Sequence, residues 1–390
     1  MKLRRPERCF PLSLYLFVIL LLAASVTAQQ EKLGETQRRE TLAPGIEHLE
    51  VRRGDFTTEA EGDRWIINAL VLDPQRTRLA LARAMDEIVG AETTSSLAAR
   101  HGALAAVNSG YFRTTGTYRG EPSGVLAIKN KILSEPFGRR SALAISNADG
   151  RTRMAIAHID FKAEIKVGRG QTRAVSGFNR PRAENELIIF TPEFHRTTLT
   201  KPDGLEIIVR RGRIVTVRDG AGSQIIPRNG YVLSASGAAR QWAQAHLRRG
   251  ARVELKSQVI SDPPLPFTAD FIIGGGPRLV ENGQFAAAEA ETFNADFRRQ
   301  RHPRTAIGIR RDGRLVLLTV DGRQPKKSVG MTIEELASLM IEFECREALN
   351  LDGGGSTTMV ISNKVVNNPS DQAGERAVSD ALLISPRAAR

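Results

Sequence analysis

The sequence is poor in cysteine, histidine and aromatic residues. Its 390 residues include 2 cysteines and 6 histidines, and aromatic residues make up only 5%. So few cysteines exclude a small scaffold held together by disulfides. With 41% hydrophobic and 25% charged residues, the chain is neither a disordered tail protein nor a collagen. Because aromatic residues are scarce, aliphatic and β-branched side chains must fill the core.

Basic residues outnumber acidic ones by 56 to 43, which gives a formal net charge of +13. The excess is spread along the chain and suits anionic partners such as phosphate-rich polymers or membrane surfaces. No basic segment is interleaved with aromatic residues, so we expect no nucleic-acid partner.

The first 28 residues have the pattern of a signal peptide. Basic residues between Lys2 and Arg8 precede an apolar run over residues 10–24, and small residues follow up to Ala28. The run is shorter than the ~20 residues needed to span a bilayer, although an uncleaved anchor is the alternative. We therefore predict an exported protein, periplasmic or extracellular, that contacts a membrane only through its signal peptide. Cys345 then has no internal disulfide partner, and we expect a buried thiol.

Residues 29–50 are polar and charged, which predicts a flexible leader before a catalytic domain over residues 51–390. Within that domain, short apolar runs alternate with turn residues and predict many strands. Helical patterns are few and cover residues 95–100, 238–249 and 333–345. The stretch from about 148 to 250 is more charged and poorer in motifs, so we interpret it as an insertion or subdomain.

A hairpin is predicted over residues 304–321. Two apolar strands flank Asp312-Gly313, a dipeptide typical of hairpin turns. A two-residue loop at these positions places Arg304 opposite Asp321, within reach of a cross-strand contact.

A helix with a capping box follows the hairpin. Thr332 and Glu335 occupy the capping positions, and apolar residues then recur at helical spacing. A short strand over residues 348–351 completes a βαβ unit, whose strands should be parallel. Asp321 and Asp352 then follow the carboxyl ends of parallel strands, where ligands favour binding. The predicted fold class is α/β to α+β: a mixed β-sheet core with a βαβ unit near the C-terminus and a few peripheral helices.

The glycine-rich segment after Asp352 is the strongest candidate binding loop. Glycines let the backbone approach a ligand closely, and their N–H groups can form an anion-binding nest. A tight turn is the alternative. A Walker loop is excluded because no lysine follows at the required spacing. The candidate loop residues are Gly353, Gly354, Gly355, Ser356 and Thr357.

Three further residues are weaker candidates. Asn108 ends a strand and could orient a sugar hydroxyl or a phosphate oxygen, or simply form a turn. Gly275 follows another strand and either lines the cleft with its backbone or forms a bend. Arg376 could clamp an anion or form a surface ion pair.

Four ordered motifs together resemble the phosphodiester glycosidase family. The resemblance covers roughly residues 103–385 and is dense only from residue 271 onward. Ser109 departs from the glycine usual in the family. The matching segments are Asn108-Ser109-Gly110-Tyr111-Phe112, Pro303-Arg304-Thr305-Ala306-Ile307-Gly308, Val320-Asp321-Gly322-Arg323 and Leu351-Asp352-Gly353-Gly354-Gly355-Ser356-Thr357.

The resemblance implies a hydrolase that cleaves the glycosidic bond of a sugar-1-phosphodiester, in a cell-surface or extracellular polysaccharide. Asp352 is the expected nucleophile or base, Asp321 its partner or the residue that orients Arg304, and Arg304 the diester clamp, with Thr305 among the substrate-binding residues. No cofactor is required, although a divalent cation between Asp321 and Asp352 stays undecided. The alternatives are an ordinary glycoside hydrolase and a non-catalytic binder of anionic cell-wall polymers.

Overall fold

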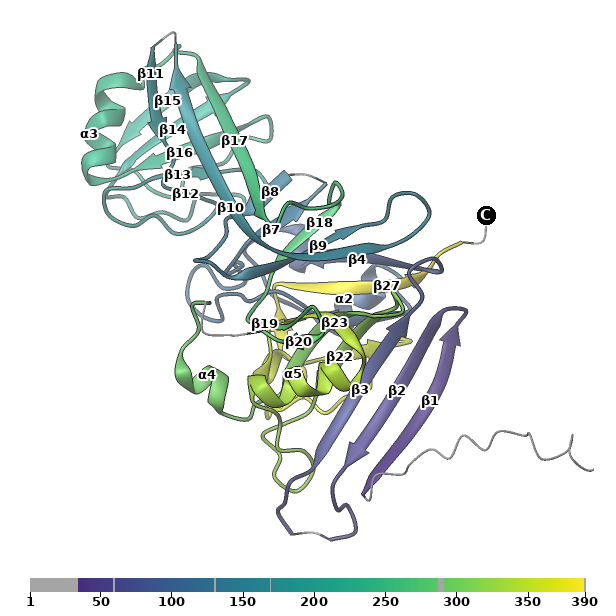
Figure 1. The fold of residues 1–390 in the computed structure, drawn as a ribbon. Helices are drawn as coiled ribbons and strands as arrows, with labels where there is room; N and C mark the ends of the chain where they lie inside the picture. Colours follow the sequence, from purple (N-terminus) through teal and green to yellow (C-terminus); the bar gives the residue numbers. More distant parts are fainter. Residues whose placement is uncertain (1–33, 59, 130, 169, 287–290, 389–390) are drawn as a thin grey trace, which may run out of the picture.

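The computed structural model describes residues 34–388 except 59, 130, 169 and 287–290 (Figure 1). The predicted signal peptide lies outside the described residues. Within the described part of the chain, no helix has both the length and the apolar character needed to cross a membrane.

The largest sheet has eight strands in the order β1-β2-β3-β22-β21-β23-β19-β20. Every neighbouring pair of strands within it is antiparallel. Its strands are β1 Glu35–Ala43, β2 Ile46–Arg53, β3 Trp65–Leu72, β22 Leu315–Val320, β21 Arg304–Arg310, β23 Cys345–Asn350, β19 Arg278–Glu281 and β20 Gln284–Phe285.

The prediction of a flexible leader is wrong from Glu35 onward, because this segment forms β1 and β2. Ile46, Leu49 and Val51 on β2 are buried, and β2 pairs with β3 along its whole length. β1 is largely exposed. Its polar composition is therefore that of an edge strand, which charged side chains protect from pairing with other chains.

A second sheet has the order β25-β24-β6-β27-β4 and supplies part of the candidate site. A two-stranded sheet of β26 and β5 accompanies it. These strands are β25 Lys364–Val365, β24 Met359–Ile361, β6 Ala105–Asn108, β27 Asp380–Pro386, β4 Thr77–Arg83, β26 Ala377–Val378 and β5 Glu92–Thr93.

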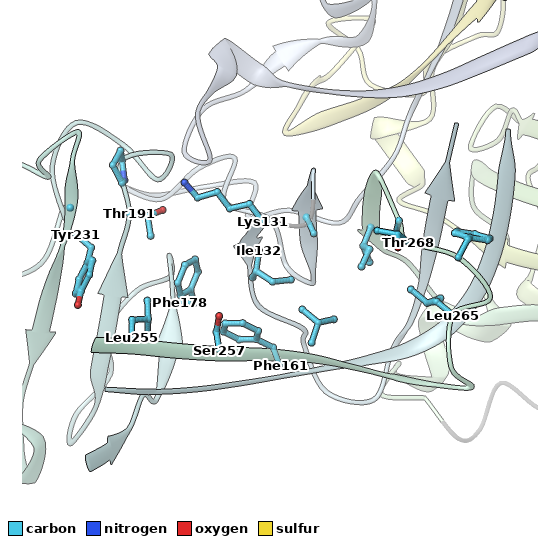
Figure 2. Close-up of a pocket in the computed structure, with 17 residues that line it drawn as sticks. Lys131, Ile132, Phe161, Phe178, Thr191, Tyr231, Leu255, Ser257, Leu265 and Thr268 are labelled. Atoms are coloured by element: carbon cyan, nitrogen blue, oxygen red, sulfur yellow. The ribbon is translucent and has the colours of Figure 1, made fainter. Parts of the chain in front are cut away.

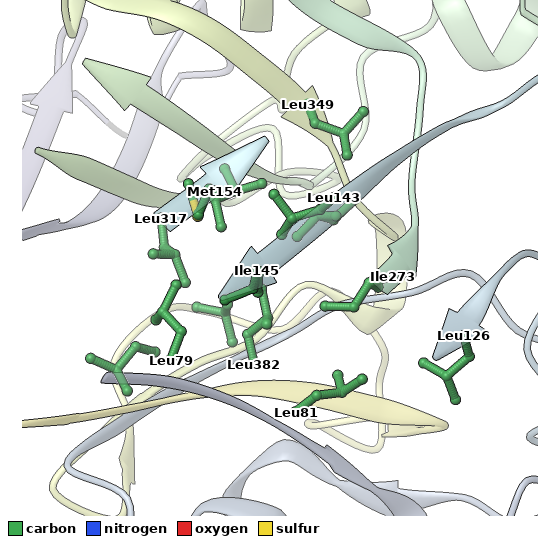
Figure 3. Close-up of a cluster of buried hydrophobic side chains, with 14 of the residues drawn as sticks. Leu79, Leu81, Leu126, Leu143, Ile145, Met154, Ile273, Leu317, Leu349 and Leu382 are labelled. Atoms are coloured by element: carbon green, nitrogen blue, oxygen red, sulfur yellow. The ribbon is translucent and has the colours of Figure 1, made fainter. Parts of the chain in front are cut away.

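A third sheet has the order β11-β10-β9-β18-β7-β8, and β17 also pairs with β10. Its strands are β11 Gln171–Ala174, β10 Arg153–Val167, β9 Ser141–Ser146, β18 Phe271–Gly274, β7 Leu126–Ile128, β8 Lys131–Ser134 and β17 Val253–Asp262. One apolar core joins the three sheets, as Figure 3 shows for Leu317 and Leu349 of the first sheet, Leu79 and Leu382 of the second, and Leu143 of the third.

The stretch from about 148 to 250, interpreted as an insertion or subdomain, contains most of a separate lobe. The long strands β10 and β17 run from the main body into this lobe (Figure 1). The sheet of the lobe has the order β12-β13-β16-β14-β15 and packs against helix α3. Its elements are β12 Gly177–Phe178, β13 Leu187–Phe190, β16 Gly230–Ala235, β14 Leu205–Arg210, β15 Arg213–Asp219 and α3 Gly237–His246.

Helices are few in this sheet-dominated fold, so the α/β class holds only loosely. The strands joined by α5, β22 and β23, each pair antiparallel with β21 and not with one another. They run in the same direction but are separated by β21, so the two strands of the predicted βαβ unit are not paired directly. The remaining helices and 3₁₀ turns are η1 Ala84–Asp86, α2 Thr94–Arg100, α4 Ala295–Arg299, α5 Ile333–Glu342 and η3 Gly354–Ser356.

The hairpin of β21 and β22 differs from the prediction by one residue. Arg310 N donates to Arg314 O at 2.8 Å, so residues 311–313 form a three-residue loop, with Gly313 at φ +84°. Such a loop needs a residue in the left-handed region, which glycine adopts at low cost. Arg304 therefore pairs with Val320 and not with Asp321. A shift of one residue reverses the face on which each side chain lies.

The predicted capping box of α5 is confirmed. Glu335 N donates to Thr332 Oγ1 at 3.1 Å, and Thr332 N donates to Glu335 Oε2 at 2.9 Å. The buried thiol of Cys345 lies in the apolar cluster that this helix covers.

Thr332→Ala is expected to lower the free energy of unfolding by about 1 kcal/mol, because a helix N–H loses its cap. Ser338→Ala is the matched control, since Ser338 is an exposed serine on the same helix that donates only to Glu334 O. Urea titrations of both variants measure the difference. An equal loss in both would contradict a specific capping role for Thr332.

Candidate active site

Asp352 lies in the loop where the first and second sheets meet. Its backbone is held by the segment that ends β6: Asp352 N donates to Ser109 O at 2.9 Å, and Asn108 Nδ2 donates to Asp352 O at 2.6 Å. Its own carboxylate accepts from Gly353 N at 2.9 Å. The residue as a whole is of intermediate exposure, and these contacts fix the position of its side chain.

Burial raises the pKa of Asp352 to about 7. The charge of Asp380 acts in the same direction, whereas the Ser356 hydroxyl, the Gly353 N–H and the positive charge of Arg376 lower the pKa. A carboxyl group with a pKa near neutrality exists in both protonation states at physiological pH, and it can accept or donate a proton. Such a group in a cleft is a candidate catalytic residue.

The three glycines after Asp352 are required by close approach of the chain. A Cβ on Gly353 would lie 2.7 Å from Pro303 O, and Gly354 has φ +63°. A Cβ on Gly355 would overlap the side chains of Asp371 and Arg376. The predicted anion nest is only partly available, because Gly353 N donates to Asp352 and Gly354 N donates to Pro303 O at 2.8 Å.

Two guanidinium groups flank this loop. A Cβ on Gly354 would lie 3.0 Å from Arg323 Nη2, which shows how closely this exposed arginine approaches the backbone. Arg376 lies against Gly355 and forms a bidentate pair with Asp371, with Nε–Oδ2 and Nη2–Oδ1 distances of 2.7 and 2.9 Å. The loop therefore has the Arg323 guanidinium on one side and the Arg376–Asp371 ion pair on the other.

The structure does not place Arg304 against Asp321. Arg304 is 1% exposed, and its Nε and Nη2 donate to the carbonyls of Met331, Phe297 and Gln300 at 2.7, 2.8 and 3.0 Å. Its guanidinium lies 4.8 Å from the centre of the Phe297 ring. Burial lowers the pKa of Arg304 to about 10. These contacts tie β21 to the segment around α4.

Asp321 is also buried, at 1% exposure, and its oxygens accept from Asn367 Nδ2 and from the backbone and side-chain N–H groups of Asn368. Burial raises the pKa of Asp321, while these amide donors oppose the shift. Its partners are therefore amides and not the predicted Arg304. Among the described residues there is also no group of three or more His, Cys, Asp or Glu side chains that could hold a metal ion.

The remaining predicted residues lie around the loop. Both amide atoms of Asn108 make protein contacts, since Oδ1 accepts from Thr305 Oγ1 at 2.8 Å and from Thr358 N at 3.1 Å. Ser356 and Thr357 are 1% exposed, and the Thr357 hydroxyl has no hydrogen-bond partner among the described residues.

Gly275 is packed too closely to line a cleft. A Cβ at this position would lie 2.7 Å from Leu349 Cδ2 and 2.9 Å from Asn350 O. A bend was one of the two roles predicted for Gly275. At this bend the chain that follows β18 packs closely against β23.

The predicted site lacked three residues that the structure brings to it. Arg323 stands in the Val320–Arg323 motif, which could have indicated it. The Tyr111 hydroxyl donates to Gly276 O at 2.8 Å and accepts from Asn350 Nδ2 at 2.6 Å. Burial and the charge of Asp352 raise the pKa of Tyr111. Asp380 is buried and accepts from Ser109 Oγ, Gly110 N and Ser379 Oγ. No spacing in the sequence points to Asp380.

A cavity of about 710 Å³ lies elsewhere, between the β10–β17 ribbon and the lobe (Figure 2). Phe161, Phe178, Tyr231 and Leu255 contribute to its largely apolar lining. None of its lining residues belongs to the loop around Asp352, so size alone does not identify the candidate active site.

Comparison with known proteins places the motifs in a family. Residues 203–385 match the family model for phosphodiester glycosidase. The resemblance predicted from the four motifs is therefore confirmed, and this part of the chain is similar to phosphodiester glycosidase domains.

Two curated relatives match shorter segments. The chain is 42% identical over 125 residues to the uncharacterized SPbeta prophage-derived protein YomE of Bacillus subtilis, which covers 30% of this chain and 19% of that protein. It is 30% identical over 156 residues to N-acetylglucosamine-1-phosphodiester alpha-N-acetylglucosaminidase of Mus musculus. This aligned segment covers 37% of this chain and 29% of that protein. The chain thus spans less than a third of the length of either relative.

A solved structure shows that the fold occurs elsewhere. The crystal structure of a Burkholderia pseudomallei protein named as exported superposes with a TM-score of 0.78, at 24% identity over 90% of this chain and 97% of that chain. This likeness extends to both the main body and the lobe, and it concerns the fold alone.

The raised pKa of Asp352 predicts a specific pH dependence of stability. A carboxyl whose folded-state pKa lies above its unfolded value favours the folded state only while it is protonated. As pH rises from about 4, near the unfolded pKa, to about 7, wild type should therefore lose stability relative to Asp352→Asn, which cannot ionise. Urea titrations at several pH values test this difference. If the two free energies of unfolding change in parallel, the pKa of Asp352 is not raised.

Proposed function

We propose that this protein is an exported hydrolase that cleaves the glycosidic bond of a sugar-1-phosphodiester in a cell-surface or extracellular polysaccharide. The observation that carries the proposal is the Asp352 carboxyl, whose pKa is raised to about 7, beside a glycine loop flanked by Arg323 and Arg376. The similarity of residues 203–385 to phosphodiester glycosidase domains supports the reaction class. The predicted signal peptide and the structural relative named as exported support the location.

The charges around the loop suit a phosphodiester. Such a substrate carries one negative charge, and a guanidinium binds phosphate oxygens through charge-assisted hydrogen bonds. Arg323 is exposed and can turn toward a ligand, whereas Arg376 is already oriented by Asp371. Together they stabilise the phosphomonoester that leaves. A phosphomonoester is a good leaving group, so the reaction needs little acid assistance.

Asp352 is the group placed to act at the anomeric carbon. In its ionised form it can attack that carbon or activate a water molecule, and it can stabilise an oxocarbenium-like transition state. Asp321 is an unsuitable second carboxylate because it is buried and its oxygens already accept from Asn367 and Asn368. The proposed chemistry therefore depends on one carboxyl that titrates near neutrality and two cations.

Hydrolysis in ¹⁸O-labelled water tests the reaction class. Attack at carbon puts the label on the sugar hydroxyl and leaves the phosphomonoester unlabelled, whereas attack at phosphorus labels the phosphate. We expect label on the sugar alone, and no turnover by Asp352→Asn. Label in the phosphomonoester would overturn the glycosidase assignment, and turnover of a neutral aryl glycoside at a similar rate would instead favour an ordinary glycoside hydrolase.

Arg323→Ala should lower kcat/KM for a sugar-1-phosphodiester by about 10- to 100-fold, because one charge-assisted contact is lost. Arg38→Ala removes an exposed arginine from β1 and serves as the matched control. Steady-state kinetics of both variants measure the effect. Equal kinetics in the Arg323 variant and the control would remove Arg323 from the substrate-binding site.

A further inference from the structure

Arg140 is a half-buried cation that lies among aromatic rings. Its guanidinium carbon is 4.3 Å from the centre of the Phe293 ring, 4.7 Å from that of Phe137 and 5.5 Å from that of Tyr111. Its Nε and Nη2 reach only Thr292 O, at 3.4 and 3.3 Å, which are long for hydrogen bonds. Among the described residues, no carboxylate oxygen lies within ion-pair distance of Arg140. The cation is thus partly desolvated without a charged partner.

Several half-buried arginines of the described chain do have carboxylate partners. Arg180 pairs with Glu135 and Glu186, Arg278 with Glu347, and Arg376 with Asp371. Burial lowers the pKa of Arg140, and the negative charge of Glu291 acts in the opposite direction. The carboxylate oxygens of Glu291, however, accept hydrogen bonds from Ser141 and from Arg278 N. Removing a charge from water is costly unless it is paired, and the aromatic faces compensate for only part of that cost.

Arg140 is connected to the candidate active site through Tyr111. The Tyr111 hydroxyl bonds to Asn350, two residues before Asp352, and the charge of Asp352 acts on the pKa of Tyr111. The ring centres of Tyr111 and Phe293 are 5.8 Å apart, and those of Phe293 and Phe297 are 5.0 Å apart. Arg140 therefore packs against an aromatic cluster, and Tyr111 of this cluster lies near Asp352.

We propose that Arg140, with Phe137 and Phe293, forms a subsite for an anionic substituent on the glycosyl chain next to the scissile phosphodiester. This proposal rests on the proposed function. The guanidinium fork binds a carboxylate or phosphate group in a bidentate manner. The exposed Phe137 ring offers apolar surface on which a sugar ring can pack, while Phe293 holds the guanidinium in place. The preferred substrate is therefore an acidic polysaccharide, whose charge suits the basic excess of the chain.

Kinetics with three matched substrates test the subsite. All three contain the same scissile sugar-1-phosphodiester, and the neighbouring sugar is neutral, carries a carboxylate or carries a phosphate. We expect wild type to prefer one or both acidic substrates. Arg140→Ala should raise KM for them by about 10-fold or more and leave the kinetics on the neutral substrate unchanged. The acidic substrate whose KM rises in Arg140→Ala identifies the substituent as carboxylate or phosphate.

Phe137→Ala provides a second variant that should fold normally, because the Phe137 side chain is 53% exposed. It should also raise KM for the acidic substrates, whereas the control Arg38→Ala should not. No preference of wild type for acidic substrates, or an equal loss on all three substrates in Arg140→Ala, would overturn the subsite.

Equilibrium binding separates this proposal from the proposed reaction. Calorimetric titration of the wild-type protein with an oligouronate, a phosphorylated oligosaccharide and a neutral oligosaccharide does not require turnover. Tighter binding of an acidic ligand that is lost in Arg140→Ala supports the subsite even if no substrate is hydrolysed. Equal binding of all three ligands contradicts it, even if the phosphodiester is cleaved.

Discussion

The buried amide of Asn108 joins the segments that carry the candidate active site. Its Nδ2 holds the carbonyl of Asp352, and its Oδ1 accepts from Thr305 on β21 and from Thr358 after the glycine loop. An unpaired amide at 0% exposure would be costly. The first and second sheets must therefore meet at this point with these bonds intact, and the position of Asp352 follows from their meeting.

The environment of Asp352 combines two opposing influences. Burial and Asp380 favour its neutral form, whereas Arg376 and the Gly353 N–H favour the ionised form. The result is a carboxyl that titrates near neutrality instead of remaining ionised like an exposed aspartate. The arginines differ in the partners of their guanidinium groups. Arg304 donates to backbone carbonyls, whereas Arg323 is exposed beside the loop. Arg140 has no ion-pair partner among the described residues.

Local patterns in the sequence predicted local features well. The capping box of Thr332 and Glu335 and the buried Cys345 depend on neighbouring residues and helical spacing, and both were predicted correctly. The glycines after Asp352 were predicted to approach a ligand, and the structure shows that they approach other segments of the protein closely. The leader prediction failed because the polar residues of β1 suit an exposed edge strand as well as a flexible segment.

The amino-acid sequence by itself determined the family motifs, the helix start at Thr332 and the glycine loop, because each depends on residues close together in the chain. Only the tertiary structure decided which charged groups meet. A single extra loop residue at 311–313 moved Arg304 out of register with Asp321. Sheet packing brought Arg376 to the glycine loop and linked Tyr111 and Arg140 to the surroundings of Asp352. Contacts between segments far apart in sequence depend on strand register and burial, and neither can be read from local spacing.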